Sequence, residues 1–383
     1  MKVRLGDVCT IVSGSTPKTN VSEYWDGEIK WITPAELSND SFYIFDSSRH
    51  LSEEAMKKTG LKLFPTGTVI LSSRAPIGKT AISGCEMCCN QGFKNLICSD
   101  RIFNEYLYFY LKSKTEFLNS LGRGATFKEI SKGIVEEIEI PLPTYDEQKR
   151  IANELKKVTE LIYLRKLQLI KLEELIKSQF IEMFGDPVTN TQGRKIVPFK
   201  DFILNIRYGT SQPPVFNQVG KYRFIRATNI KAGRISEQNM LMIDENAAAG
   251  LEKCKLIGGE IIIVRSGVNT GDTCIVTDAY VGDYAGYDII VSLDRSICNP
   301  VFFNEMINTH YMEKVVKPLT ARSAQPHINA EQVQNLPIVY ASLSEQNRFA
   351  DFIQQVDKSK FEIGVSLEKL EVLKNALMQE SFG

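Results

Sequence analysis

The sequence predicts an α+β protein with an internal repeat: two mixed α/β domains, separated by two long helices that pair as an antiparallel coiled coil. Three observations carry this prediction. A long heptad-patterned segment lies in the middle of the chain, a closely similar segment forms its last forty residues, and the globular pattern that precedes the first segment restarts after it. The expected parts are a first domain over 1–143, helices over 144–185 and 343–383, and a second domain over 186–342.

The first long helix is expected over 144–185, which has no proline and has glycine only at its last position. Thr144 followed by Glu147 is a capping-box signature, and Gly185 is a stop signal. At 1.5 Å per residue this helix is roughly 60 Å long, so its apolar stripe needs a partner. Its seam consists of Ile151, Leu155, Val158, Ile162, Leu169, Leu172 and Ile176, with Arg165 and Gln179 at two polar seam positions.

The second long helix repeats the first. Glu345-Gln346 matches Glu147-Gln148, and both segments end in Phe-Gly. Its seam consists of Phe349, Ile353, Val356, Ile363, Leu367, Leu370 and Leu377, with Lys360 and Lys374 at the polar positions. We expect the polar positions of the two helices to face each other. An antiparallel pair related by a pseudo-twofold axis is the most economical assembly, although heptads alone also allow a parallel pair.

The two globular segments are related but have diverged. In the first, β-branched runs at 29–32 and 68–72 predict strands, and 52–58 and 104–118 predict helices. The second of these helices has Tyr106, Phe109, Tyr110 and Phe117 on one broad apolar face. In the second segment, a polar linker comes first, and then 222–229 echoes 29–36 while 259–267 echoes 67–75. Similar helices joined to dissimilar domains suggest a fixed spacer that carries two readers with different targets.

Composition leaves the partner open. The 383 residues include 46 Lys+Arg and 46 Asp+Glu, so any contact with a polyanion requires local patterning of positive charge. No apolar run is long enough to span a membrane, and the first residues do not resemble a secretory signal. The eight cysteines are therefore expected to be reduced thiols in a cytoplasmic protein.

Catalytic and metal motifs are weak. Residues 73–80 contain Gly-Lys-Thr but begin with Ser73 and include Pro76, which favours a strand-to-strand turn over a phosphate-binding loop. Cys85, Cys88 and Cys89 have no second ligand pair, so packing thiols are expected rather than zinc ligands. The histidines His50, His310 and His327 are scattered. With no dinucleotide, nucleophile-elbow, zinc-protease or amino-methyltransferase motif, we expect no catalytic residue, metal or cofactor in this chain.

The recurring chemistry is a set of loops that mix Arg and Lys with Thr, Asn, Gln and Gly. Arg and Lys suit guanine and phosphate, while Asn and Gln suit adenine, so these loops are candidates for reading double-stranded DNA. Surface loops are also polar without any such role. The candidates are Thr16, Lys18, Arg74, Lys79, Lys94, Arg123, Thr126, Lys128 and Lys132 in the first domain, and Arg207, Arg226, Thr228, Asn229, Arg265, Asn269, Arg322, Gln325 and His327 in the second.

The whole chain resembles the specificity (S) subunits of type I restriction-modification systems. The resemblance rests on three motifs and on the two-unit architecture; the motifs are Ile-Pro-Leu-Pro-x4-Gln-Lys-Arg-Ile at 140–151, Phe-Ile-Glu-Met-Phe-Gly-Asp-Pro at 180–187 and Thr-Phe-Lys-Glu-Ile-Ser-Lys at 126–132. Two departures weaken the second repeat. The junction at 336–341 lacks the second proline, and Gly364 interrupts the second helix.

The resemblance implies that each globular domain reads one half of a bipartite, asymmetric DNA site. The helices would set the unread gap and dock two methyltransferase (M) subunits, with restriction (R) subunits joining through the complex. S-adenosylmethionine, ATP and Mg would then belong to the partner subunits, and this chain alone would be non-catalytic. Two alternatives stay open: a coiled-coil scaffold whose domains bind proteins, and a standalone modification enzyme.

Overall fold

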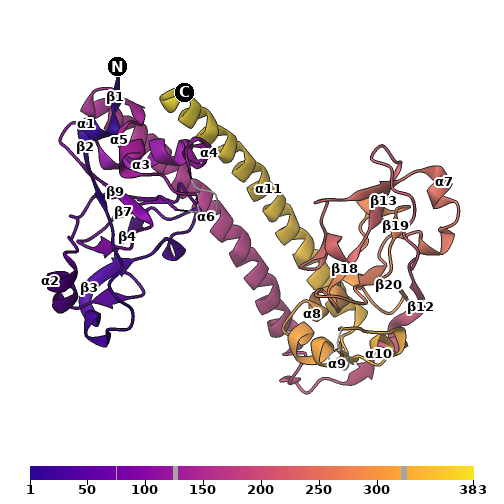
Figure 1. Ribbon diagram of the computed structural model, residues 1–383. Helices are drawn as coiled ribbons and strands as arrows, with labels where there is room; N and C mark the ends of the chain where they lie inside the picture. The colour runs from indigo at the N-terminus through magenta and orange to yellow at the C-terminus, as the bar shows by residue number, and fades with distance from the viewer. Residues whose placement is uncertain (75, 124–127, 321–325) are drawn as a thin grey trace. The chain divides into compact units, whose positions relative to one another are not determined.

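The computed structural model confirms the predicted α+β class and describes residues 1–74, 76–123, 128–320 and 326–383. Figure 1 shows two mixed α/β parts and the two long helices, α6 (Tyr145–Phe184) and α11 (Leu343–Phe382). The chain forms two compact units, unit 1 from Met1–Lys166 with Val365–Gly383, and unit 2 from Leu167–Gly364. Each unit therefore contains about half of each long helix.

The long helices pair antiparallel within each unit. In unit 1, Lys166 near the middle of α6 lies 3.5 Å from Glu371 in the second half of α11. In unit 2, Glu173 in the second half of α6 forms an ion pair with Lys360 in the first half of α11. In unit 2 the rings of Phe180 and Phe349 also pack together, and in unit 1 Ile151 lies beside Leu377. Within each unit, residue numbers therefore rise along one helix as they fall along the other.

Capping fixes both helix starts. The Glu147 N–H donates to Thr144 Oγ1 at 3.3 Å, which is one half of the predicted capping box. In α11 the box is complete, because the Ser342 N–H donates to the Glu345 carboxylate at 2.8 Å and the Glu345 N–H donates to Ser342 Oγ at 3.3 Å. Gly185 ends α6 with φ +80°, a left-handed conformation that glycine adopts without strain.

The seam residues avoid solvent, but the polar positions do not all face each other. Leu155, Val158, Ile162, Ile176, Phe349, Ile353 and Val356 are buried, and Ile151, Leu169, Leu172, Ile363, Leu367, Leu370 and Leu377 are half-buried. Gln179 was expected to face a lysine of the second seam, and for Lys360 this expectation is wrong. The neighbours of Gln179 are Arg348 and Phe352. The cause is the register, in which the rings of Phe180 and Phe349 pack 5.5 Å apart.

Unit 1 contains a five-stranded and a three-stranded sheet. The first has the order β2-β9-β6-β7-β4, antiparallel except for the β7–β4 pair, and the second has the order β5-β3-β8. The strands are β2 (Cys9–Ser13), β3 (Trp25–Ile32), β4 (Tyr43–Ile44), β5 (His50–Leu51), β6 (Val69–Ser72), β7 (Thr80–Ser83), β8 (Cys88–Cys89) and β9 (Phe93–Cys98). The strands predicted at 29–32 and 68–72 are confirmed as parts of β3 and β6.

The shorter helices of unit 1 are α1 (Leu5–Val8), α2 (Glu53–Thr59), α3 (Asn104–Ser113), α4 (Thr115–Ser120) and α5 (Lys132–Glu136), with short turns η1 (Ser22–Tyr24) and η2 (Pro34–Glu36). Helices α1, α3 and α5 contact strands of the larger sheet, whereas α2 packs on the three-stranded sheet. The single helix expected over 104–118 is wrong. The backbone leaves helical geometry at Lys114 (φ −104°, ψ 17°), and the chain bends so that Leu118 enters the core while Phe117 stays 46% exposed.

Unit 2 repeats this plan with different details. Its four-stranded sheet has the order β12-β20-β17-β18, and its three-stranded sheet has the order β16-β13-β19. The strands are β12 (Ile203–Tyr208), β13 (Tyr222–Ile225), β14 (Ile230–Lys231), β15 (Arg234–Ile235), β16 (Leu241–Ile243), β17 (Ile261–Ile263), β18 (Thr273–Ile275), β19 (Tyr284–Ala285) and β20 (Ile289–Leu293). Its helices and turns are η3 (Phe199–Phe202), η4 (Ala227–Asn229), α7 (Glu245–Ala248), η5 (Glu252–Cys254), η6 (Asp278–Tyr280), α8 (Pro300–Ile307), η7 (Met312–Val316), α9 (Lys317–Thr320) and α10 (Ala330–Gln334).

The predicted repeat is visible where each domain joins its long helix. Strand β1 (Lys2–Arg4) pairs with β10 (Glu139–Pro141), and β11 (Ile196–Pro198) pairs with β21 (Pro337–Val339) in the same antiparallel arrangement. A fully buried glutamine follows each junction. Gln148 Oε1 accepts from the Phe103 N–H at 2.8 Å, and Gln346 Oε1 accepts from the Asn299 N–H at 2.8 Å.

The ends of the long helices belong to the cores of the units. Leu155 and Phe382 are part of the main hydrophobic core of unit 1, where the Phe382 ring lies 5.3 Å from that of Tyr106. Phe184 and Phe349 are part of the main core of unit 2. The helices are therefore anchored by the domains that they join, as well as by their own seam.

Candidate nucleic-acid interface

In unit 1 two candidate loops are joined by backbone hydrogen bonds. Strands β6 and β7, which flank the first of these segments, pair antiparallel with Leu71 opposite Thr80. This geometry is the predicted strand-to-strand turn and differs from the strand-to-helix turn of a phosphate-binding loop. The Ile130 N–H donates to the Ser73 carbonyl at 2.9 Å, and Glu129 forms isolated β-bridges with Arg74 and Arg123. Glu129 and Ile130, which come shortly before α5, therefore lie against Ser73 and Arg74.

Glu129 organises the charge at this junction. Its carboxylate accepts from Arg74 Nε at 2.8 Å and from Lys94 Nζ at 3.2 Å. Burial alone raises the pKa of Glu129, but the hydrogen bonds and charges of Arg74 and Lys94 outweigh it and lower the pKa. The carboxylate thereby holds the Arg74 side chain, which is 44% exposed, in one orientation.

Lys94 was predicted to contact DNA, but the structure places it in the interior. It is only 6% exposed, and its ammonium also donates to Ser73 Oγ at 3.3 Å. A buried ammonium with two internal partners supports the loop and does not reach a surface ligand. Lys79 is half-buried in a similar role, because its Nζ donates to the Leu37 carbonyl at 2.6 Å and to the Pro34 carbonyl at 3.4 Å.

The remaining candidates of the first domain lie at the surface where they are described. Lys18, Arg123 and Lys128 are exposed. Thr16 is exposed too, and its hydroxyl is hydrogen-bonded to Gln91, while Lys132 lies 3.5 Å from Glu136. Thr126 lies outside the described residues.

In unit 2 the corresponding junction has different chemistry. The Ile328 N–H donates to the Arg265 carbonyl at 2.9 Å, as Ile130 does to Ser73 in unit 1. The Arg265 guanidinium lies 4.5 Å from the ring centroids of both Tyr208 and Tyr287. Its Nε donates to Nε2 of His327 at 3.0 Å. The two tyrosines and His327 therefore fix the direction of a half-buried arginine.

Asn229 and Arg207 are also corrected as contact candidates. Asn229 is fully buried, and its Nδ2 donates at 3.1 Å to the carbonyls of Ser236 and Gln238. Arg207 binds the buried Glu260 through two nitrogens, with Nη2 to Oε2 at 2.8 Å, and also donates to the carbonyl of Lys253 at 2.9 Å. The hydrogen bonds of both side chains are made to groups inside the domain.

Three other candidates surround the Arg265 junction. Thr228 is exposed, and Asn269 is half-buried with its Nδ2 3.4 Å from the Ala227 carbonyl. Arg226 donates from Nη2 to the Asn239 carbonyl at 3.1 Å, while its buried Nε has no partner among the described residues. Arg322 and Gln325 lie outside the part of the chain that the structure describes.

Sequence reasoning missed the residues that orient these cations. Glu129, Tyr208 and Tyr287 were not among the candidates, since an acidic side chain and a lone tyrosine do not by themselves suggest contact with DNA. A signal was present for one of them, because Glu129 is an acidic residue within the basic loop motif at 126–132. The tyrosines lie at 208 and 287, and their common contact with Arg265 depends on the fold.

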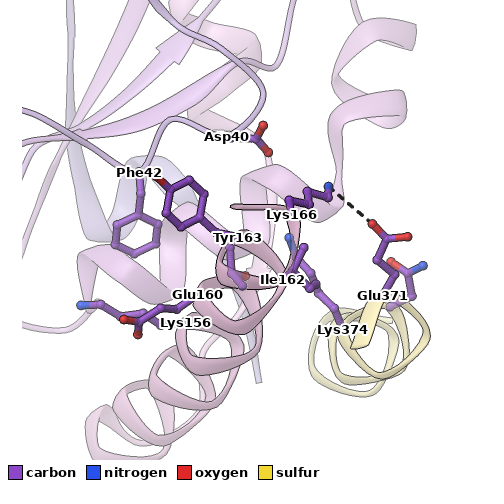
Figure 2. A pocket seen from close by; sticks show the side chains of 11 residues that line it. Asp40, Phe42, Lys156, Glu160, Ile162, Tyr163, Lys166, Glu371 and Lys374 are labelled. Atoms are coloured by element: carbon purple, nitrogen blue, oxygen red, sulfur yellow. Dashed lines mark ion pairs between the residues drawn. The ribbon is translucent and has the colours of Figure 1, made fainter. Parts of the chain in front are cut away.

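A separate pocket of about 590 Å³ lies in unit 1 between α6, α11 and the loop before β4. Figure 2 shows Phe42 and Tyr163 beside the lysines of the two helices, with Lys166 paired to Glu371. On one wall, Lys156 Nζ donates to Glu105 at 2.7 Å. On another wall lies Lys374, whose pKa is lowered because burial disfavours its charged form. The helix pair thus offers an amphipathic hollow that includes the seam positions Ile162 and Lys374.

Metal-binding clusters and membrane-spanning helices are absent from residues 1–74, 76–123, 128–320 and 326–383. No cluster of three or more His, Cys, Asp or Glu residues there could hold a metal ion. All eight cysteines are unbridged, and Cys88 and Cys89 are buried in β8. None of the helices in these ranges combines the length and apolar character of a bilayer-spanning segment.

Other known proteins are similar to this chain over both of its domains. The family model described as "Type I restriction modification DNA specificity domain" matches residues 1–174 and again 197–373. The chain is 28% identical to the type I restriction enzyme MjaIX specificity subunit of Methanocaldococcus jannaschii, covering 98% of this chain and 90% of that one. It is 23% identical to the EcoKI specificity subunit of Escherichia coli over 67% of this chain and 59% of that one.

Solved structures show a similar fold. The S subunit of a type I restriction-modification system from M. genitalium matches with a TM-score of 0.62 at 15% identity, covering 100% of this chain and 96% of that one. A chain from a structural study of the assembly and conformational transition of the type I R-M system matches with a TM-score of 0.60 at 19% identity, covering 100% and 97%. At these identities the likeness concerns the fold alone.

Proposed function

This chain belongs to the type I restriction-modification DNA specificity family, and from that premise we propose how its two halves divide the work of recognition. The predicted family resemblance is confirmed by a family model that matches twice, once in each half. The chain is a DNA-specificity subunit with two specificity domains. Each domain reads one half of a split DNA sequence, and the helices between them set the length that is not read.

One observation supports this division more than any other. Both domains build the same backbone junction, with Ile130 bonded to Ser73 in unit 1 and Ile328 bonded to Arg265 in unit 2. The side chains at that junction differ. Unit 1 presents Arg74 held by Glu129, whereas unit 2 presents Arg265 held by tyrosines and His327. A common frame with different side chains is what two readers of different sequences require.

The exposed and half-exposed cations supply the contact chemistry. Arginine donates two hydrogen bonds to a guanine edge in the major groove, and lysine or arginine also binds phosphate. In the first domain we assign this role to Arg74, Arg123 and Lys128. In the second domain we assign it to Arg226 and Arg265. The buried Lys94 and Asn229 instead hold the loops in position.

The helices are assigned to assembly. We propose that α6 and α11 dock two methyltransferase subunits, and that the hollow of Figure 2 is part of the docking surface. Adenine methylation, with its S-adenosylmethionine, and ATP- and Mg-dependent cleavage by restriction subunits would then take place in partner chains. This chain contributes recognition and geometry but no catalytic group.

The test is a binding comparison. Methylated adenines are first mapped in cells with and without the gene, which gives the recognition sequence. The complex of this chain with its methyltransferase subunits is then titrated with that sequence and with a scrambled duplex at one fixed salt concentration, because phosphate contacts dominate raw affinity. We expect preference for the mapped sequence by about a thousandfold or more. Equal affinity would favour the alternative in which the two domains bind proteins.

A further inference from the structure

Unit 2 contains a pocket of about 350 Å³ beside the Arg265 junction, and its walls are aromatic. Phe216, Phe224 and Tyr287 line it. Phe216 and Tyr287 are 40% and 42% exposed, so they stand at the mouth, whereas Phe224 is buried at 3%. Sites for small molecules have volumes of about 300–1,000 Å³, so this pocket is near the small end of that range.

Two polar groups in the wall have hydrogen-bonding capacity to spare. Arg226 lines the pocket, and its Nη2 donates to the Asn239 carbonyl at 3.1 Å, while its Nη1 has no acceptor among the described residues. Asp288 is only 3% exposed, and its Oδ1 accepts from the Arg265 N–H at 3.1 Å. Its second oxygen has no partner in the described part of the chain. Burial raises the pKa of Asp288 to about 6, so the carboxyl is poorly stabilised as an anion in the absence of a ligand.

These groups fit a flat ring with polar edges better than they fit a phosphate. A phosphate would be repelled by the Asp288 carboxylate and would gain nothing from three aromatic walls. A nucleobase can stack on aromatic side chains while its edge accepts a hydrogen bond from a guanidinium and donates one to a carboxylate. Arg226 as a donor and Asp288 as an acceptor are therefore complementary to the edge of a nucleobase.

We propose that this pocket receives one nucleobase of the second half-site, turned out of the DNA duplex and held between Phe216 and Tyr287 with its edge on Arg226 and Asp288. The inference rests on the proposed function, because it presumes that the second domain binds DNA. It adds a second mode of reading, in which one base pair is recognised by opening it rather than through its groove edge.

The pocket chemistry belongs to the second domain only. The Gly286 N–H donates to the Ile225 carbonyl at 2.7 Å, and the Asn90 N–H donates to the Ile32 carbonyl at 3.1 Å, which aligns the two domains at this point. Arg226, Tyr287 and Asp288 then correspond to residues that carry no ring, guanidinium or carboxylate; these are Thr33, Gln91 and Gly92. The first half-site therefore serves as an internal control.

The test uses the complete complex with its methyltransferase subunits and the mapped recognition duplex at fixed salt. At each base pair of the second half-site, one strand at a time receives either a mismatched base or an abasic residue. The methylated adenines are left out, because methyltransferases themselves turn out their target base. A mismatch opposite the extruded base lowers the free energy needed to turn that base out of the duplex, so it favours binding. An abasic residue at the same position removes the base that would fill the pocket, so it weakens binding.

We expect one position where the opposite-strand mismatch tightens binding by about tenfold and the abasic residue weakens it by about tenfold. Both effects should shrink to less than about twofold in Phe216→Ala and in Asp288→Asn. Phe216 is partly exposed, and asparagine at 288 keeps the oxygen that accepts from Arg265, so at least one variant should fold. Lys200→Ala, which changes an exposed cation that does not line the pocket, should leave both effects intact.

The possible outcomes distinguish failure of the pocket proposal from failure of the proposed function. Mismatches that weaken binding at every position of the second half-site, in a complex that still prefers the mapped sequence, would overturn the pocket proposal alone. Loss of preference for the mapped sequence would overturn the proposed function itself. Micromolar binding of free nucleosides without any position effect in DNA would assign the pocket to a small molecule and overturn its assignment to a DNA base.

Discussion

Arg265 Nε donates a hydrogen bond to His327 Nε2 at 3.0 Å, although the two residues are 62 positions apart in the sequence. The contact joins the turn after β17 to the loop before α10, two segments that the sequence separately marked as candidates for reading DNA. It also fixes His327, because the nitrogen that accepts this bond must be unprotonated. The pair is thus a preorganised donor assembly in the second domain.

The first prediction concerns this pair. Arg265→Ala should relax specificity at one position of the second half-site by about 1–3 kcal/mol and leave the first half-site unchanged, because a directed guanidinium contact to a base would be lost. Binding is measured on duplexes carrying single-base changes in either half. Lys200→Ala provides the control for a general loss of positive charge. A uniform loss of affinity for all duplexes would instead mean that Arg265 contacts phosphate.

The second prediction concerns the buried glutamines. Gln148→Leu should lower the free energy of unfolding by about 2 kcal/mol or more, since the Phe103 N–H and the Arg101 and Pro143 carbonyls lose their partner in the interior. Urea unfolding of the isolated chain measures the change. Lys149→Ala, at the exposed neighbouring position, should change stability by less than about 0.5 kcal/mol. An equally small effect of both variants would show that the junction is not held by this side chain.

The third prediction concerns pH. Hydrogen bonds from Ser342, followed by the Arg194 guanidinium, lower the pKa of Glu345 to about 2 from an ordinary value of 4.5. A carboxylate whose pKa is lower in the folded than in the unfolded state adds stability above the unfolded value, and this stability is lost as the pH falls through the folded value. The difference in unfolding free energy between the wild type and Glu345→Gln should therefore be constant near pH 6 and shrink between pH 4.5 and 2. A difference that grows on acidification would contradict the assignment.

Much of the fold could be predicted because its signals are local. The heptad pattern, the Thr144 cap and the Gly185 stop placed the first helix within one residue of the observed Tyr145–Phe184. The repeat was readable because Gln148 and Gln346 each follow a glutamate and each precede an arginine by two positions. The break at Lys114 was not readable, because the residues around it favour helix and only packing in unit 1 bends the chain there.

The site was less predictable, since burial and pairing are tertiary properties. Lys94 is a residue type that usually lies at the surface, but its position in β9 buries it, and its Nζ donates to the Glu129 carboxylate. Arg207 is likewise occupied by Glu260, which is 53 positions away and gave no sign of pairing. The loop composition identified segments that the fold brings together, such as those that carry Arg265 and His327. It could not separate the residues that face outwards from those that support them.

The fourth prediction concerns the spacer. Because α6 and α11 each contribute to both units, one heptad inserted into each helix, after Lys166 and after Gly364, should keep the seam in phase. The methylated sequence of such a variant should have a longer unread gap and the same two half-sites. Insertion of four residues into each helix is the control, since it breaks the heptad phase and should reduce assembly. A change in half-site sequence would contradict the separation of reading from spacing.

The most direct test of the central claim is an exchange of one domain. Residues 197–342 are replaced by the corresponding segment of another family member, and the methylated adenines are mapped in cells that carry the hybrid with the native methyltransferase subunits. The account predicts a sequence that keeps the first half-site and the gap and acquires a new second half-site. A hybrid that changes both half-sites, or that keeps both, would contradict the claim that each domain reads one half.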